Sequence, residues 1–276
     1  MRQLLLAVMV VVSACGVGVD ERTPVGTSES PLSYEEFKAR TLREPDTGIW
    51  VLNMDEIAET EVQLRESYDE YVQDFIAARS SRATAEQPLI VNRVSGRDDK
   101  WSATAARNIT YCISSSSFGT RYSTVVSAMN SATAAWESAG NVNFVHSSAQ
   151  DGSCTRTNNN VVFNVRLVSG QSYLARAFFP SSSRSAREIL IDSSSFGNIS
   201  PWTLTGILRH ELGHTLGFRH EHTRPEAGTC YEDSNWRALT AYDSRSVMHY
   251  PQCNGTQTGD LVLTSLDQQG ARSLYP

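Results

Sequence analysis

The order of predicted elements indicates an α+β fold built on a mixed sheet. A strand-like run at 107–113 precedes an amphipathic helix over 122–139, and several short β-prone runs follow, separated by Ser, Gly and Asn. A strand, a helix and then several strands are typical of a mixed sheet covered by helices. The chain of 276 residues, 40% hydrophobic and 20% charged, is long enough for one large domain or for a domain with an accessory segment.

Each of these elements has its own sequence signal. The helix predicted over 122–139 carries apolar residues on one face, with Ser123 as its N-cap and Gly140 just past its end. That face consists of Val125, Val126, Met129, Ala132, Thr133 and Trp136. The β-prone runs are 141–146, 161–168, 174–179 and 188–192. A further helix should begin at Ser200, as N-cap, with Pro201 in its first turn.

Composition excludes two broad classes of protein. The longest apolar run, residues 4–12, is too short to span a bilayer as a helix, so a polytopic membrane protein is excluded. A formal charge of −6 and a pI near 5.5 argue against general nucleic-acid binding.

The first fifteen residues have the features of an export signal. Arg2 gives a positive start, residues 4–12 are apolar, and small residues precede Cys15. The run Val-Ser-Ala-Cys resembles a bacterial lipobox, which implies that Cys15 is lipidated and becomes the new N-terminus. Ordinary signal cleavage nearby, with Cys15 incidental, is the alternative. We expect residues 1–15 to be a lipoprotein-type signal peptide and the lipid to be the only attachment to a membrane.

The remaining chain divides into two unlike parts. Residues 20–92 hold 16 acidic against 7 basic residues, whereas residues 93–276 hold 14 against 16 and contain all six histidines. We expect residues 16–92 to be a tether and an acidic propeptide, and residues 93–276 to be the functional domain. A helix is predicted from the spacing of apolar residues between Leu64 and Ile76, and a polar, protease-sensitive stretch follows at 79–85. A small independent domain or a spacer is the alternative for this acidic part.

Four cysteines lie in the second part: Cys112, Cys154, Cys230 and Cys253. An exported chain is exposed to oxidising conditions, and four cysteines allow three pairings. The absence of a CxxC pair argues against a structural zinc site. We favour the pairs 112–154 and 230–253, because each closes a loop of moderate length.

The strongest motif is His-Glu-Leu-Gly-His-Thr-Leu-Gly-Phe-Arg-His at 210–220. His210 and His214 lie one helical turn apart and can share one Zn²⁺. Gly217 stands where a left-handed residue would end the helix, which lets the chain return His220 to the same metal. Three histidines leave a fourth position open, as a catalytic zinc requires. Glu211 is then the general base that takes a proton from the metal-activated water and passes it to the leaving amine.

This extended motif identifies the chain as resembling the metzincin peptidases, and the astacins in particular. Glu221 and Arg224 match the astacin continuation after the third histidine, and the run 242–250 resembles the astacin Met-turn. The resemblance implies that Met248 lies beneath the zinc and that Tyr250 assists the transition state. It also implies a twisted, mostly parallel sheet, with two long helices above the zinc cleft and a C-terminal helix, residues 263–275, below it. Bacterial peptidases of the dual-action HEIGH type share this arrangement.

The resemblance extends to the substrate cleft and to the propeptide. Leu174, Ala175, Arg176 and Ala177 are similar to the sheet edge on which metzincins bind an extended substrate; a buried strand is the alternative. Astacin propeptides place an aspartate on the zinc, for which Asp46 and Asp55 are the candidates.

A role or a location is also expected for Glu221 and for three histidines outside the ligand set. The astacin glutamate that corresponds to Glu221 meets the N-terminus formed by propeptide cleavage. We expect His222 to face solvent, His249 to be structural, and His146 to lie at the surface.

The sequence therefore predicts an exported zinc endopeptidase, made as a zymogen, that acts on polypeptides and is held at a bacterial cell envelope by its lipid or secreted. One alternative is a catalytically silent zinc-binding surface lipoprotein that acts as a binding module; another is a metal hydrolase acting on something other than peptides. The intact Glu211 and the lack of an evident fourth protein ligand argue against the silent protein.

Overall fold

The computed structural model describes residues 30–80 and 89–276. The predicted signal peptide, Cys15 with its lipid, and most of the predicted cleavage stretch lie outside the described residues. Residues 31–276 form one compact unit. Within the described part of the chain, no helix combines the length and apolar character needed to cross a membrane.

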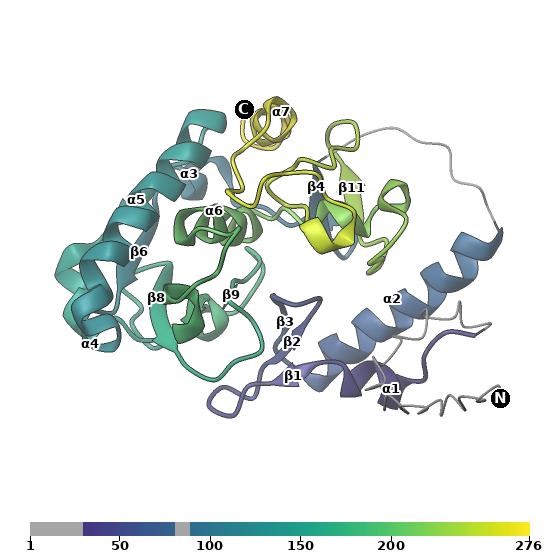
Figure 1. The fold of residues 1–276 in the computed structure, drawn as a ribbon, viewed down its shortest axis with the longest axis horizontal. Coiled ribbons are helices and arrows are strands. Elements are labelled where there is room, and N and C mark those ends of the chain that lie inside the picture. Colours follow the sequence, from purple (N-terminus) through teal and green to yellow (C-terminus); the bar gives the residue numbers. More distant parts are fainter. Residues whose placement is uncertain (1–29, 81–88) are drawn as a thin grey trace, which may run out of the picture. The chain divides into compact units, whose positions relative to one another are not determined.

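Residues 31–80, called the N-terminal segment below, contain two helices and a small sheet (Figure 1). The elements are α1 (Tyr34–Ala39), β1 (Leu42–Arg43), β2 (Trp50–Leu52), β3 (Glu56–Ala58) and α2 (Glu61–Ser80), and β1, β2 and β3 pair antiparallel. α1 begins with a capping box in which Ser33 and Glu36 exchange hydrogen bonds. The helix predicted from the apolar spacing between Leu64 and Ile76 is confirmed as α2.

The main sheet has five strands in the order β7-β6-β8-β10-β9. They are β6 (Ile109–Ile113), β7 (Phe144–His146), β8 (Phe163–Val168), β9 (Ala175–Arg176) and β10 (Glu188–Asp192). β6, β7, β8 and β10 are parallel to one another, and β9 runs antiparallel to β10 at the edge. The predicted mixed, mostly parallel sheet is confirmed, although the run at 174–179 contributes only two paired residues.

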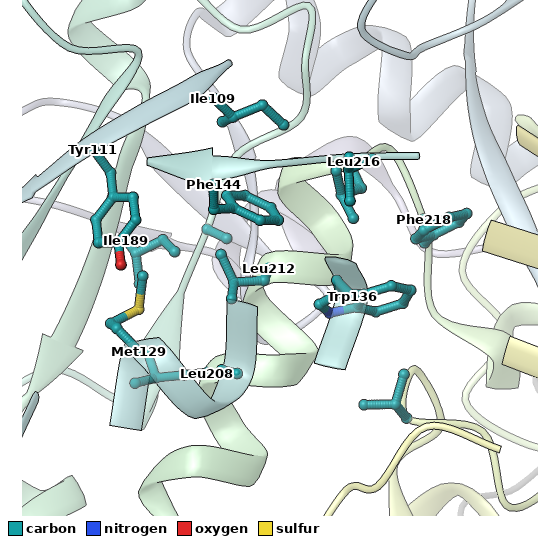
Figure 2. Packing of buried hydrophobic residues seen from close by; sticks show 14 of the residues in the cluster. Ile109, Tyr111, Met129, Trp136, Phe144, Ile189, Leu208, Leu212, Leu216 and Phe218 are labelled. Atoms are coloured by element: carbon teal, nitrogen blue, oxygen red, sulfur yellow. The ribbon is translucent and has the colours of Figure 1, made fainter. Parts of the chain in front are cut away.

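One face of this sheet carries the hydrophobic core. Ile189 and Ile191 of β10 point into it, with α5 (Tyr122–Ala139) and α6 (Leu204–Thr215) packed above. Figure 2 shows side chains of this core from close by, with Trp136 next to Phe218. Their rings stack at a centroid separation of 5.1 Å. The core thus fixes α6, the helix that bears the zinc motif, against the sheet.

The N-cap residues of α5 and α6 both differ from the prediction. α5 has the predicted bounds, but its N-cap is Arg121, because a 3₁₀ turn leads into it and Ser123 already lies inside the helix. α6 begins at Leu204 rather than at Pro201, because the Thr203 hydroxyl accepts a hydrogen bond from the Gly206 amide at 2.9 Å and caps the helix there.

The remaining elements surround the sheet and α6. They are β4 (Ile90–Val94), β5 (Arg97–Asp98), α3 (Ala103–Ala106), α4 (Ser115–Phe118), β11 (Trp236–Ala238) and α7 (Ser265–Leu274), with β11, β4 and β5 forming a third sheet. α7 is the C-terminal helix that the family resemblance implied. The structure joins Cys112 to Cys154 and Cys230 to Cys253, the pairs favoured from loop length.

Candidate metal centre

Three histidines converge at the end of α6. The helix places His210 and His214 one turn apart, and the left-handed backbone of Gly217, at φ +96°, turns the chain so that His220 returns to them. Their Nε2 atoms are buried and have no hydrogen-bond partner among the described residues. Together with one oxygen of Asp55, these atoms lie within 4.8 Å of one another. Unpaired buried nitrogens that point to one place are the donor set expected around Zn²⁺.

The other nitrogen of each ring is held by a hydrogen bond. The carbonyl of Val247 is 2.8 Å from His210 Nδ1, the carbonyl of Phe218 is 2.8 Å from His214 Nδ1, and a carboxylate oxygen of Glu232 is 2.6 Å from His220 Nδ1. Acceptors at all three Nδ1 atoms keep the proton there and leave Nε2 free for a metal.

Glu232 was missed by the sequence analysis. Its carboxylate also accepts from His222 and Arg219, and all of these groups are buried. Burial opposes ionisation of Glu232, but the nearby charge of His220 and its hydrogen bond outweigh it, so the pKa of Glu232 lies well below its usual value. A carboxylate ten or so residues beyond a ligand histidine has no sequence signal of its own, because the intervening loop determines where it lies.

Glu211 lies beside the ligands and lines a cavity of about 330 Å³. The cavity wall also includes His210 and Tyr250 together with the apolar side chains of Trp202 and Leu261. Burial and then the negative charge of Asp55 raise the pKa of Glu211 well above its usual value, and its Oε2 atom has no hydrogen-bond partner among the described residues. A carboxyl with a raised pKa next to a metal-binding pocket is suited to accept and return a proton.

Two residues of the predicted Met-turn, Met248 and Tyr250, lie against α6 and a ligand ring. Met248 is fully buried beside α6, where a Cβ atom on Gly213 would lie 2.4 Å from its sulfur. The Tyr250 ring stacks on His210 at 5.1 Å, and its hydroxyl donates a hydrogen bond to Asp55. His249 is buried and bonded to Tyr242 at 2.8 Å, away from the three ligands.

The prediction is wrong for His222, whereas His146 is partly exposed and lies at the edge of the surface. His222 is buried rather than solvent-facing, because Glu232 pairs with its Nε2 atom and its Nδ1 atom accepts from the Tyr250 amide. His146 stacks on Tyr111 at 5.1 Å and lies 3.0 Å from a carboxylate oxygen of Asp151.

Of the two aspartates considered in the N-terminal segment, Asp55 reaches the histidines. Its carboxylate lies 3.2 Å from His210 Nε2, 3.5 Å from His214 Nε2 and 2.9 Å from His220 Nε2. Asp46 lies elsewhere, where its carbonyl faces Arg156 at 3.5 Å. The turn between β2 and β3 positions Asp55, so that the N-terminal segment covers the candidate metal centre.

The predicted substrate edge corresponds to β9. Leu174 and Ala175 line the cavity beside Glu211, and Ala177 is buried in the core. Arg176 points to the opposite face of the sheet, where Glu44 of the N-terminal segment accepts two hydrogen bonds from it, both 2.7 Å.

Glu221 and Arg224 lie side by side below the ligand loop. Glu221 is fully buried, with one oxygen bonded to the Asp243 amide at 3.1 Å and the other unpaired in the described structure. Two nitrogens of Arg224 make no hydrogen bond in the described structure, although one of them, Nη1, lies 3.8 Å from a Glu221 carboxylate oxygen; the third bonds to Glu226 at 2.9 Å. Burial is the main cause that raises the pKa of Glu221 well above its usual value.

Comparison with known proteins finds partial relatives. A bone morphogenetic protein 1 homolog of Strongylocentrotus purpuratus is 39% identical in a region covering 16% of this chain and 10% of that protein. High choriolytic enzyme 2 of Oryzias latipes is 36% identical in a region covering 17% of this chain and 22% of that enzyme. The chain therefore matches only about a tenth and a fifth of the length of these curated relatives.

Two solved structures were also compared. Myroilysin has a TM-score of 0.46 at 19% identity, covering 68% of this chain and 98% of that one. High choriolytic enzyme 1, a hatching enzyme zinc-protease from Oryzias latipes, has a TM-score of 0.41 at 20% identity, covering 63% and 96%.

The comparison with protein families covers the region that holds the ligands. The model of the dual-action HEIGH metallo-peptidases matches residues 81–236, more than half of the chain. This region includes α6, the three histidines, Glu211 and Glu232. With its peptidase motif folded into a buried three-histidine cluster, the chain belongs to the dual-action HEIGH metallo-peptidase family.

Proposed function

We propose that the protein is a zinc-dependent endopeptidase that hydrolyses peptide bonds of polypeptides. The observation that carries the proposal is the convergence of three buried Nε2 atoms, those of His210, His214 and His220, on one point beside the carboxyl of Glu211. In the described structure the Asp55 carboxylate lies at that point. When bound there, zinc would polarise the scissile carbonyl and lower the pKa of a water.

The chain's own residues divide the remaining work. Glu211 takes a proton from the attacking water and returns it to the leaving amine. Tyr250, whose ring stacks on His210, supplies a hydroxyl for the developing oxyanion once Asp55 has left it. The unpaired edge of β9, Ala175–Arg176, offers backbone groups to an extended substrate.

The full-length chain is a latent form in this proposal. Asp55 occupies the position where the histidine nitrogens meet, and it also accepts the Tyr250 hydroxyl proton. The N-terminal segment is accordingly the blocking part of the predicted propeptide, and cleavage before β4, which pairs with β11, exposes the site. The unpaired oxygen of Glu221 supports its proposed pairing with the new N-terminus.

Export is part of the same proposal. Two disulfides in residues 89–276 are stable in an oxidising compartment and uncommon in a reducing one. The N-terminal signal and the lipid on Cys15 would hold the enzyme at the bacterial cell envelope.

The test compares wild type with Glu211→Ala after limited proteolysis of the full chain. We expect both proteins to retain zinc, and casein cleavage to fall by about 10²–10⁴ in the variant because the proton acceptor is missing. Glu226→Ala, which removes an exposed carboxylate outside the cavity, is the matched control and should cleave normally.

The outcomes separate the two main hypotheses. Zinc in both proteins with no cleavage by wild type would favour the catalytically silent binding module. Cleavage by Glu211→Ala at the wild-type rate would refute the role of Glu211.

A further inference from the structure

The outer face of the main sheet holds a buried arginine with a built carboxylate pocket. Arg176 is fully buried and lies in β9, the edge strand beside the candidate metal centre. Its Nε and Nη2 atoms each donate to the Glu44 carboxylate at 2.7 Å, and the Tyr173 hydroxyl donates to the same carboxylate at 2.7 Å. Three short hydrogen bonds to one carboxylate form a geometrically specific site for an anion of that shape.

The carboxylate in this pocket belongs to Glu44 of the N-terminal segment, and the donors belong to the rest of the chain. In residues 89–276, Arg176 donates to a backbone carbonyl, that of Glu188 at 3.3 Å, and its side chain also lies within hydrogen-bonding reach of Tyr173. The Glu188 carboxylate accepts hydrogen bonds from Asn164 and Arg166, both at 2.6 Å; its charge acts on Arg176, but no hydrogen bond joins the two side chains in the described structure. Removal of the N-terminal segment therefore takes away the one carboxylate that Arg176 and Tyr173 share as acceptor in the described structure. A buried guanidinium without a hydrogen-bonded carboxylate favours binding of a new one.

The register of the strands places this pocket within reach of a bound peptide. Arg176 pairs with Leu190 across β9 and β10, so both side chains lie on the face opposite the core. Leu190 and Tyr173 are there covered by Val51 of the N-terminal segment. A peptide added to the free edge of β9 would place every second side chain on this same face.

We propose that Arg176 and Tyr173 form a subsite for an acidic side chain of the substrate, which Glu44 fills in the full-length chain. The inference rests on the proposed peptidase function and adds a substrate class to it: polypeptides with Glu or Asp at the position that pairs on the outer face of β9. Glu44 then acts as a substrate-like occupant at a point distinct from the contact of Asp55 with the histidines.

The experiment uses the zinc-loaded full chain, digested until mass spectrometry no longer detects residues 31–80. Its substrates are quenched fluorescent peptides of one sequence in which Glu or Gln stands in turn at each position from four before to three after the scissile bond. We expect kcat/KM to favour Glu over Gln at one position by about tenfold, since only the carboxylate takes charge-assisted hydrogen bonds from Arg176.

Variants assign the preference to the pocket. Arg176→Gln should bring the Glu-to-Gln ratio at that position to about one, and Tyr173→Phe, which removes one of three hydrogen bonds, should give an intermediate ratio. Arg156→Gln makes the same charge change at a partly exposed arginine outside the pocket and should keep the wild-type ratio. Because each readout is a ratio within one protein, a variant of lower overall activity remains informative.

Three results would overturn the proposal. Equal cleavage of Glu and Gln peptides at every position by wild type would refute the subsite and leave the peptidase intact. A preference that survives in both Arg176→Gln and Tyr173→Phe would place its origin elsewhere. Failure to cleave any peptide or casein would refute the peptidase function, and the subsite with it.

Discussion

At the scale of single residues, the candidate centre depends on what holds each imidazole in place. His210 and His214 are fixed by backbone carbonyls, so the fold itself orients them. His220 differs, because its Nδ1 atom is paired with the side chain of Glu232 at 2.6 Å. A side-chain partner can be removed by one substitution, which makes the third ligand the one whose orientation can be tested.

Glu232→Ala should weaken zinc binding by roughly 10–100-fold, because His220 loses the acceptor that fixes its tautomer and ring orientation. Affinity is measured by competition with a chromophoric chelator. Glu226→Ala, an exposed carboxylate in the same loop, should bind zinc as wild type does. Equal affinities for Glu232→Ala and wild type would show that His220 needs no such support.

Asp55→Ala should make the uncleaved chain active. The substitution removes the carboxylate that lies 2.9–3.5 Å from the three Nε2 atoms and accepts the Tyr250 hydroxyl proton. We expect peptide cleavage by the uncleaved chain to rise by roughly tenfold or more, which corresponds to the loss of about 1.4 kcal/mol of blocking interaction. Asp46→Ala, the other aspartate considered from sequence, should stay latent. An inactive Asp55→Ala chain that still binds zinc would mean that other contacts of the N-terminal segment block the cleft.

Local motifs and distant partners differed in how well they could be predicted. The residues His210, Glu211, His214 and His220 follow from spacing within one helix and one turn, which short-range geometry determines. The burial of His222 did not follow, since it depends on Glu232, and the partner of Arg176 is Glu44, 132 residues away. Side chains brought together by the fold from distant positions leave no periodic signal in a single sequence.

At the scale of elements, the end of α6 decides where His220 lies. Gly217 has φ +96°, and a Cβ atom there would stand 2.0 Å from the carbonyl oxygen of Asp99. The sequence predicted this end correctly because glycine in a left-handed position has a clear signal. It placed the start three residues too early, because the cap is Thr203 and its hydrogen bond to Gly206, whereas the Ser-Pro pair lies in the preceding loop.

Gly217→Ala should lower the free energy of unfolding by about 2–5 kcal/mol, combining left-handed backbone strain with overpacking. Gly228→Ala is the matched control: its φ is +72°, but nothing lies within 4 Å of the added methyl, so only the strain of about 1–2 kcal/mol applies. Thermal unfolding of the zinc-loaded full chains gives the comparison. Equal melting temperatures for the two variants would show that the loop carrying Asp99 yields without cost.

At the scale of the whole molecule, the N-terminal segment is held by buried charge pairs as well as by apolar packing. Glu44 pairs with Arg176, and Glu56 pairs with Arg219 at 3.0 Å, next to His220. Burial alone would raise the pKa of Glu44, but the hydrogen bond and charge of Arg176 outweigh it and the pKa lies below its usual value. The acidity and position of this segment predict it from the sequence, but these pairs are not predictable, because neither arginine stands near its partner in the chain.

The sign of the Glu44 shift predicts how acid affects retention of the segment. A carboxyl with a lowered pKa binds its proton less readily in the folded state, so its stabilisation is complete above the pKa of about 4.3 in a free chain and is lost as pH falls through the lower folded value. The groups facing Glu44 are Arg176, Tyr173 and Thr47. The phenol of Tyr173 and the hydroxyl of Thr47 do not titrate in this pH range. A chain nicked between residues 80 and 89 should therefore release residues 31–80 more readily near pH 4 than near pH 7, as measured by gel filtration.

Asp55 and Glu56 titrate as well, so the contribution of Glu44 is obtained by comparing the release of residues 31–80 in wild type and in Glu44→Gln. The difference in release should be largest at neutral pH and shrink on acidification. A difference that stays constant with pH would mean that the Glu44–Arg176 pair does not depend on the charge of the carboxylate.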